Sequence, residues 1–406
     1  MTIPPPATDA APDAAPATTD APPVALVELD ITTLAAGGDG VGRDGTGRVT
    51  FVPRAAPGDR LRAKIVHATS SFARAELVEL ITPSAHRVVP PCPHFVAGCG
   101  GCAWQHVTRA EQLVAKQAIV AGALRKLTDV RLHPIADPGP ALGWRRRARF
   151  HIERGKAGLY ELGTNRVIPI DRCPQLEPAL DAAYAYVATA TPPDGELAMV
   201  LAHDGRIALA TERAWRGAAR LIGRAGIAGI LAGDVPHGEV VLEVEPGLWG
   251  GPWDFAQASR AGNAALIAQT RAALGRGAGR VLELYAGAGN FTRGFAADGW
   301  DVVPSDSEAP PKPPAGFQVG AAKDVLARLA GPWDAIVLDP PRTGAAEAIE
   351  GIVRAAPRTI VYVSCDAATL ARDAAKLTGY RATDAWPLDV MPETSHVEVV
   401  MRLQRV

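Results

Sequence analysis

The chain has 406 residues, of which 48% are apolar and 21% are charged, and its formal net charge is −1. This length predicts two or three globular domains. The sequence has no run of 18 or more apolar residues, which excludes a membrane-spanning helix. Because phosphate contacts need Lys and Arg, the near-neutral charge restricts any binding of nucleic acid to local basic segments.

The first segment, residues 1–23, is rich in Ala, Pro and Thr and contains no Lys or Arg. Its composition predicts a disordered tail, and it lacks the basic start and apolar stretch of a secretory signal. The five cysteines are an odd number, which does not favour structural disulfides. We therefore expect a cytoplasmic monomer with no membrane partner.

Residues 24–82 alternate apolar and polar positions in short runs that glycine-rich turns separate. Four or five short strands in such a segment are typical of a small β-barrel of the OB type. Barrels of this type often bind nucleic acid, and a purely structural β-module is the alternative.

Residues 83–255 predict a central mixed α/β domain with a cysteine-rich loop near its start. A helix expected over about residues 109–127 has apolar residues at helical spacing and could pack on the domain that follows. The run from Trp144 to Arg149 contains four arginines, which offer a basic contact for RNA. A solvated strand edge is an equally good interpretation of this run.

Residues 256–406 alternate apolar strands with helices, which predicts an α/β domain with a doubly wound, Rossmann-like sheet. Ligands of such sheets bind at the carboxyl ends of the strands. One strand runs into a glycine-rich turn, and the next ends at Asp306, about 20 residues on, where a carboxylate can hold ribose hydroxyls. We therefore expect a cofactor to contact the turn at Gly287, Gly289 and Asn290, and to contact Asp306.

Three later strands deliver reactive groups. Asp339 ends a strand and precedes two prolines, which rigidify the loop over the ligand site. Cys365 lies just before a helix, so we expect the helix dipole to lower its pKa and favour the thiolate, although a buried inert cysteine is the alternative. Glu398 lies in an apolar strand, where an unpaired carboxylate costs free energy, so we expect it to have a functional role.

Cys365 and Glu398 together suit the methylation of a pyrimidine carbon. Carbon 5 of uracil becomes nucleophilic when a thiolate adds at carbon 6, and a base must later remove the proton from carbon 5. Cys365 fits the first role and Glu398 the second. Arg342 stands where an amino-group methyltransferase normally carries an aromatic residue, which favours methylation of carbon over nitrogen.

Four cysteines in the N-terminal half form a second candidate site. Cys92, Cys99 and Cys102 are separated by six and two residues, and Cys173 follows much later in the chain. Four thiolates can hold zinc or a four-iron cluster, and the arrangement of three plus one favours the cluster. Four unrelated free cysteines are the alternative.

The strings CPHF…CGGC, FAQ, ELYAGAGNF, DPPR, SCD followed by ATLARD, and HVEVV occur in this order. In this combination the sequence from about residue 24 onward resembles the RNA 5-methyluridine methyltransferase family. The resemblance implies an N-terminal TRAM barrel, a central RNA-contacting domain and a C-terminal domain that binds S-adenosylmethionine. It also implies that Cys365 is the nucleophile, Glu398 is the base, and the four cysteines hold a 4Fe-4S cluster, as in the ribosomal branch. The cofactor contacts that it implies are Gln257, Tyr285, Asp306 and Asp339.

The sequence departs from the family pattern at three places. The usual asparagine after Gln257 is replaced by Ser259, and the cysteine often found in the glycine turn is replaced by Ala286. The segment after Asp306 is rich in proline where relatives usually have a helix, and Ala321 stands at the position of an adenine-side polar contact, with Asp324 close by. These changes affect the adenine end of the cofactor site and leave the Cys365 and Glu398 motifs intact.

The resemblance favours methylation of ribosomal RNA, with 23S RNA as the substrate, over transfer RNA. Two other interpretations remain at this point. A cytosine C5 methyltransferase shares the thiol chemistry, but it usually places its cysteine after a proline, whereas Ser364 precedes Cys365 here. A catalytically inactive RNA-binding protein with the same fold would have little need of Cys365, Glu398 and Asp339 together.

Overall fold

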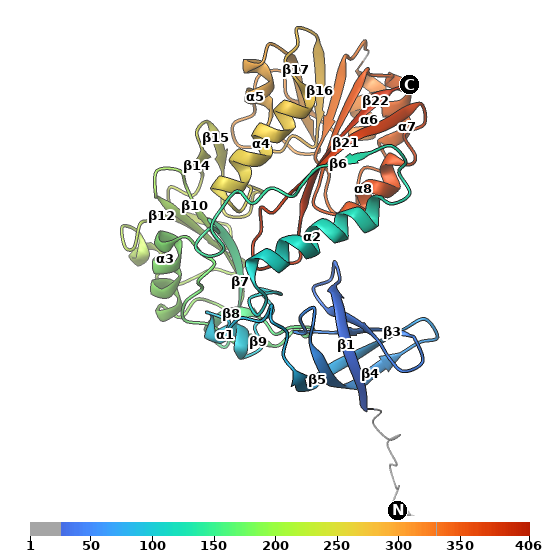
Figure 1. The fold of residues 1–406 in the computed structure, drawn as a ribbon. Coiled ribbons are helices and arrows are strands. Elements are labelled where there is room, and N and C mark those ends of the chain that lie inside the picture. The colour runs from blue at the N-terminus through green and yellow to red at the C-terminus, as the bar shows by residue number, and fades with distance from the viewer. Residues whose placement is uncertain (1–25, 330) are drawn as a thin grey trace, which may run out of the picture.

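The computed structural model of the chain describes residues 26–329 and 331–406 (Figure 1). The tail expected over residues 1–23 lies outside the described residues. Within the described part, no helix is both long and apolar enough to cross a membrane.

The first five strands close into a barrel in the order β1-β2-β3-β5-β4, which confirms the predicted barrel. β3 and β5 pair in parallel, and the other neighbours pair antiparallel. Side chains alternate between the two faces of each strand, so Leu29, Ile31 and Leu61 share the interior. The strands are β1 (Leu26–Leu34), β2 (Gly40–Arg43), β3 (Val49–Val52), β4 (Arg60–Ala68) and β5 (Phe72–Thr82).

The segment after the barrel reaches the C-terminal domain before the central domain begins. α1 (Pro93–Val96) lies in the cysteine-rich loop, and α2 (Arg109–Leu124) packs against α8 (Ala367–Ala374) of the C-terminal domain. β6 (Arg131–Leu132) then pairs in parallel with β21 (Tyr380–Leu388) at the edge of the C-terminal sheet. Val120 and Leu124 of α2 are fully buried or nearly so and belong to the C-terminal core, so this early segment is part of that domain.

The central domain is a seven-stranded sheet in the order β13-β12-β11-β10-β7-β8-β9, with α3 packed on it. The stacked rings of Phe150 and Tyr184, with centroids 4.0 Å apart, join the sheet to α3. A separate hairpin, β14-β15, follows. The elements are β7 (Arg147–Glu153), β8 (Lys156–Tyr160), β9 (Val167–Pro169), α3 (Pro178–Thr189), β10 (Gly195–Leu201), β11 (Ile207–Thr211), η1 (Ala218–Leu221), β12 (Ile227–Ala232), β13 (Val235–Gly238), β14 (Leu242–Glu245) and β15 (Leu248–Gly250).

The C-terminal domain is an eight-stranded sheet in the order β18-β17-β16-β19-β20-β22-β21-β6. β22 runs antiparallel to β20 and β21, while β16, β17, β19 and β20 are parallel. This arrangement, with helices between the parallel strands, confirms the predicted doubly wound fold. The elements are α4 (Arg260–Leu274), β16 (Arg280–Leu284), α5 (Thr292–Ala297), β17 (Asp301–Asp306), β18 (Gln318–Val319), α6 (Ala322–Arg328), β19 (Ala335–Leu338), α7 (Ile349–Ala355), β20 (Thr359–Ser364), α8 (Ala367–Ala374), β21 (Tyr380–Leu388) and β22 (Glu398–Arg405).

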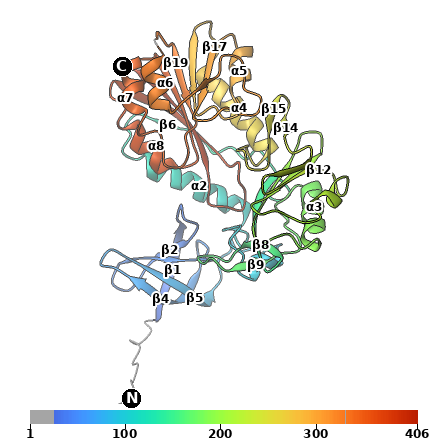
Figure 2. The same cartoon turned by 180° about the vertical axis from the view of Figure 1, so that it is seen from behind.

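The three parts of the molecule meet around α2. Figure 2 shows α2 between the barrel and the C-terminal domain, with the central domain beside its N-terminal end. The side chain of Trp104, just before α2, donates a hydrogen bond of 2.9 Å to the carbonyl of Gly38 in the barrel. The loop that precedes β22 lies at the same place, because Cβ atoms of Ala103 and Ser395 both approach Gly38.

Candidate active site

The strand register places the thiol of Cys365 across from the carboxylate of Glu398. Ser364, the last residue of β20, pairs with Val399 of the antiparallel β22. Continuing this register by one residue brings Cys365 opposite Glu398, the first residue of β22. Glu398 is only 5% exposed. The structure therefore brings together the two residues that the sequence predicts as nucleophile and base.

A second carboxylate, Asp339, lies beside this pair. It follows β19, the neighbour of β20 in the sheet, so it reaches the same edge. Burial raises the pKa values of both Asp339 and Glu398, and repulsion between the two carboxylates adds to the rise at Glu398. A carboxylate with a raised pKa is a stronger base once it is ionised, which suits proton abstraction.

The predicted effect of the helix dipole on Cys365 is wrong in direction. Burial, followed by the negative charge of Glu398, raises the pKa of Cys365 to about 11. Asp366, not Cys365, caps α8, because its carboxylate accepts a 2.7 Å hydrogen bond from the backbone NH of Thr369. The positive end of the helix is thus taken up by another side chain.

Arg342 supplies the positive charge that the dipole does not. Its guanidinium acts to lower the pKa of Cys365 and also that of Glu398, against the effect of burial. Nη2 of Arg342 lies 3.1 Å from Nε2 of His396. Burial and the nearby cations lower the pKa of His396 to about 4, so its ring is neutral and can accept this hydrogen bond from the guanidinium. The sequence interpretation did not assign either residue to the site.

The glycine turn and Asp306 also come together. Asp306 ends β17, and its Oδ2 accepts a 2.8 Å hydrogen bond from the backbone NH of Gly287. Tyr285, Gly287 and Gly289 have φ values of +58°, +53° and +87°, the left-handed region that glycine adopts without strain. A Cβ atom at Gly289 would lie 3.0 Å from Oγ1 of Thr292 and 3.1 Å from Cγ of Pro314, so a larger residue there requires these neighbours to shift.

Two of the predicted cofactor contacts, Asn290 and Gln257, lie close to α4. Both polar atoms of the Asn290 side chain bond to Asn263 of α4, at 3.0 and 2.8 Å, so this amide is turned toward the helix. Gln257 lies in the loop before α4, where its carbonyl accepts a 3.0 Å hydrogen bond from Nε of Arg146. Ser259, which replaces the family's asparagine, is the N-cap of α4 and accepts from the NH of Gly262 at 3.0 Å.

The proline-rich segment after Asp306 forms a loop that contacts the glycine turn and β15. Pro314 approaches Gly289, and Nζ of Lys312 lies 3.1 Å from the ring centroid of Trp249. Ala321 caps α6 without a side-chain hydrogen bond, and Asp324 lies in the first turn of that helix. A carboxylate is therefore present next to the position where Ala321 offers no polar group.

The sequence interpretation also overlooked Glu283, at the end of the strand before the turn. It is 1% exposed, and burial raises its pKa to about 8. Oγ1 of Thr292 donates a 2.6 Å hydrogen bond to one carboxylate oxygen, and the other oxygen has no partner among the described residues. An acidic residue at the end of an apolar strand was the signal that could have identified it.

The basic run from Trp144 to Arg149 leads into β7, which begins at Arg147. Because β7 is an interior strand between β10 and β8, the interpretation of this run as a solvated sheet edge is wrong. Arg146 is 1% exposed and pairs with Glu245 at 2.5 Å. The guanidinium groups of Arg147 and Arg149 lie 5.6 and 5.2 Å from the ring centroids of Phe255 and Trp253. Cations and aromatic rings therefore alternate beside the loop that carries Gln257.

The four N-terminal cysteines line one cavity. In the part of the chain that the structure describes, no three His, Cys, Asp or Glu side chains are arranged to hold a metal ion. Arg145 lines the same cavity, and its buried Nε has no partner among the described residues. Arg54 of the barrel donates a 2.8 Å hydrogen bond to the carbonyl of Cys99, and its buried Nη1 is likewise unpartnered. The four cysteines that line the cavity are Cys92, Cys99, Cys102 and Cys173.

Comparison with known proteins agrees with this geometry. Residues 24–78 match the TRAM domain family, and residues 330–406 match the tRNA (Uracil-5-)-methyltransferase family. The 23S rRNA (uracil(1939)-C(5))-methyltransferase RlmD of Edwardsiella ictaluri is 33% identical, over 92% of this chain and 94% of the relative. The protein of the same name from Pectobacterium atrosepticum is 32% identical, over 94% of each chain.

A solved structure shows the same fold. The tRNA (uracil-54, C5)-methyltransferase of Pyrococcus abyssi, in complex with S-adenosyl-L-homocysteine, matches with a TM-score of 0.72 at 22% identity. The match covers 93% of this chain and 100% of that one. The sequence identity and coverage of the two RlmD relatives show that the chain belongs to the RNA uracil-C5 methyltransferase family.

Proposed function

We propose that this protein transfers a methyl group from S-adenosylmethionine to carbon 5 of a uridine in RNA, and that the RNA is 23S ribosomal RNA. The observation that carries the proposal is the placement of Cys365 across from Glu398 at the edge of the sheet. The names of the two RlmD relatives favour ribosomal over transfer RNA.

The chemistry follows from the charges around Cys365. In its thiolate form, which the guanidinium of Arg342 stabilises, Cys365 adds to carbon 6 of the uracil, and the ring becomes an enolate that is nucleophilic at carbon 5. Bound S-adenosylmethionine supplies the methyl group. Glu398 then takes the proton from carbon 5, the double bond between carbons 5 and 6 re-forms, and Cys365 leaves as the thiolate.

The residues around the glycine turn fit S-adenosylmethionine. Asp306 presents a carboxylate to ribose hydroxyls at the end of β17, and the absence of side chains at Gly287 and Gly289 lets the cofactor approach the backbone. Asp339, Tyr285 and Gln257 are the remaining proposed contacts, whereas Asn290 is left out because both polar atoms of its amide bond to Asn263. For the RNA, the arginine and aromatic pairs on β7 and its neighbouring loop offer cations for phosphates and rings for unstacked bases.

The test uses 23S RNA fragments that contain 5-fluorouridine in place of uridine. Fluorine at carbon 5 does not leave as a proton does, so the reaction stops at a covalent complex of protein and RNA. We expect an adduct that survives a denaturing gel, requires S-adenosylmethionine and disappears in Cys365→Ala. An adduct with transfer RNA alone would reassign the substrate, and no adduct with either RNA would refute the covalent mechanism.

We also propose that the four-cysteine cavity holds a 4Fe-4S cluster. The four thiols share one cavity, and four thiolates in an arrangement of three plus one are a ligand set that such a cluster accepts. The unpartnered Nε–H of Arg145, which lines the cavity, supports an anionic occupant, since buried donors are normally paired.

Iron and acid-labile sulfide measured on protein purified without oxygen test this second proposal. We expect about four of each per chain. Cys102→Ser should lose them, whereas Cys365→Ser should keep them and serves as the control. Zinc in place of iron, or no metal in the wild type, would refute the proposal of a cluster.

A further inference from the structure

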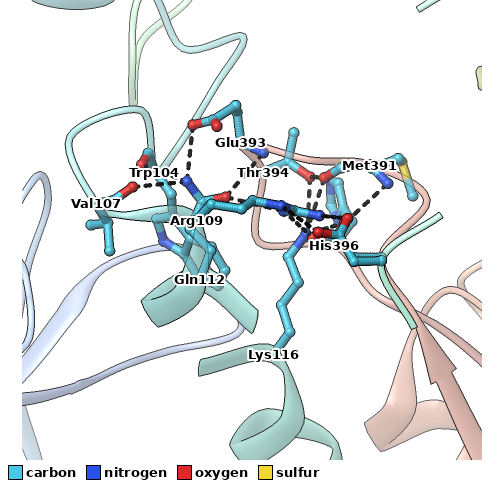
Figure 3. Close-up of polar contacts among 11 residues, drawn as sticks. Trp104, Val107, Arg109, Gln112, Lys116, Met391, Glu393, Thr394 and His396 are labelled. Carbon is cyan, nitrogen blue, oxygen red and sulfur yellow. Dashed lines mark hydrogen bonds and ion pairs between the residues drawn. The ribbon is translucent and has the colours of Figure 1, made fainter. Parts of the chain in front are cut away.

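The loop of residues 389–397 connects β21 to β22, and it carries His396 and leads directly into Glu398. Figure 3 shows that this loop is held by polar side chains of α2, a helix that lies far earlier in the chain. Because Leu388 pairs with Glu398 across β21 and β22, the two ends of the loop meet beside the proposed base.

The first attachment is a buried ion pair at the start of the loop. Nζ of Lys116 lies 2.6 Å from Oδ1 of Asp389, and both side chains are fully buried. The same ammonium donates to the carbonyl of Met391 at 3.1 Å, and Arg109 pairs with the second oxygen of Asp389. The backbone NH of Met391 also donates to Asp389, at 3.2 Å. The pair therefore fixes both a side chain and the backbone of the loop.

The second attachment holds the middle of the loop. Glu393 has a φ of +63°, a left-handed conformation that a residue with a side chain adopts only when its surroundings enforce it. The amide of Gln112, which is fully buried, donates to the Glu393 carboxylate at 3.0 Å and accepts from its NH at 3.3 Å. The backbone NH groups of Ala103 and Trp104 both donate to the Glu393 carbonyl, at 2.9 and 3.1 Å.

A short series of hydrogen bonds connects these attachments to Arg342, which lies beside Cys365. The hydroxyl of Thr394 donates to the carbonyl of Met391 at 2.7 Å and accepts from the NH of His396 at 3.3 Å. His396 in turn accepts the hydrogen bond from Arg342, the cation beside Cys365. The loop therefore places both the base and the partner of the guanidinium.

We propose that Lys116 and Gln112 are positioning residues, which hold the loop so that the carboxylate of Glu398 can reach the proton on carbon 5. This inference rests on the proposed function. A buried ion pair adds little stability compared with apolar residues of the same size, but its geometry is demanding. A displacement of a catalytic group by about 1 Å can reduce a rate a hundredfold. Neither residue touches the uracil in this scheme.

The experiment measures how the reaction divides between two products. A misplaced Glu398 leaves nucleophilic addition and methyl transfer possible but slows proton removal, so the methylated RNA stays attached to Cys365. The experiment compares the variants Lys116→Met and Gln112→Met with the wild type. Each protein reacts with uridine-containing RNA and methyl-labelled S-adenosylmethionine. The label found in the denatured protein–RNA adduct is then compared with the label found in free RNA. Gln112→Met leaves the ion pair of Lys116 intact, so the test does not depend on one variant folding.

Asp384→Asn is the matched control. Asp384 lies on β21, is 2% exposed and pairs with Arg131 at 2.7 Å and Arg402 at 2.5 Å, away from the end of the strand that meets Glu398. Its loss should reduce stability without changing the ratio of adduct to free product.

In both test variants we expect the ratio of adduct to free methylated RNA to rise at least about tenfold over the wild type. Glu398→Gln, which lacks the base itself, should change the ratio in the same direction. An unchanged ratio in folded Lys116→Met and Gln112→Met, together with an adduct in Glu398→Gln, would overturn the positioning role alone. The proposed function itself fails if 5-fluorouridine RNA gives no adduct with the wild-type protein, and the positioning role then fails with it.

Discussion

Replacing Glu398 with glutamine should make the folded protein more stable while blocking turnover. Glu398 is 5% exposed. Burial and the charge of Asp339 raise its pKa, so the ionised carboxylate is less favourable in the folded than in the unfolded chain. Glutamine has nearly the same shape and carries no charge.

The gain should depend on pH. When a carboxyl group has a higher pKa in the folded state, the folded state binds more protons, and stability falls as the pH rises above the unfolded value of about 4.3. Because burial raises the folded pKa well above the unfolded value, the expected gain at pH 8 is on the order of a few kcal/mol. For a domain of this size, such a gain raises the melting temperature by roughly 3–10 °C.

Thermal unfolding followed by circular dichroism at pH 5 and pH 8 measures this effect. The advantage of Glu398→Gln over the wild type should be small at pH 5 and clearly larger at pH 8. Glu350→Gln, which removes a carboxylate that is 91% exposed, is the control and should change stability by less than about 0.5 kcal/mol at either pH. A Glu398→Gln protein that is less stable at pH 8, or equally improved at both pH values, would refute the reasoning.

Three further substitutions test single contacts. Arg342→Met removes the cation that opposes the rise in the Cys365 pKa. The rising limb of the plot of kcat/KM against pH should therefore shift to higher pH, with roughly tenfold lower activity at pH 7. An equal loss of activity at every pH would contradict this. Ser259→Ala removes the cap of α4 and should lower the free energy of unfolding by about 1 kcal/mol in urea titrations. Gly289→Ala introduces a Cβ at a φ of +87° and 3.0 Å from Thr292, so calorimetry should show S-adenosylmethionine binding at least about tenfold more weakly, with full affinity as the contradicting result.

The barrel and the doubly wound sheet could be predicted because their signals are local. Alternation with a period of two marks β1 to β5, and apolar strands between helices mark β16 to β20. The turn at Gly287 and the carboxylate of Asp306 could be linked for the same reason, since consecutive parallel strands end at one edge.

Contacts between distant segments had little such signal beyond the apolar spacing of the helix expected over about residues 109–127, which does pack on the C-terminal domain. Nothing in the local pattern around Lys116 indicates that its charge is buried against Asp389, or that β6 extends the C-terminal sheet beside β21. The pKa of Cys365 was misjudged for a related reason. Its position before a helix is visible in the sequence, but the capping by Asp366 and the nearness of Glu398 depend on tertiary structure.

The direction of β22 explains why Glu398 could be suspected from its burial but not placed. In a parallel sheet, functional groups gather at the carboxyl ends of the strands, and Glu398 is at the amino end of its strand. Since β22 runs antiparallel to β20, its beginning lies at the edge where β20 ends, and the base thereby meets Cys365. The same reversal requires the chain to turn between Leu388 and Glu398 within a short loop. That loop enters the reacting site, so its attachment to α2 bears on the chemistry as well as on folding.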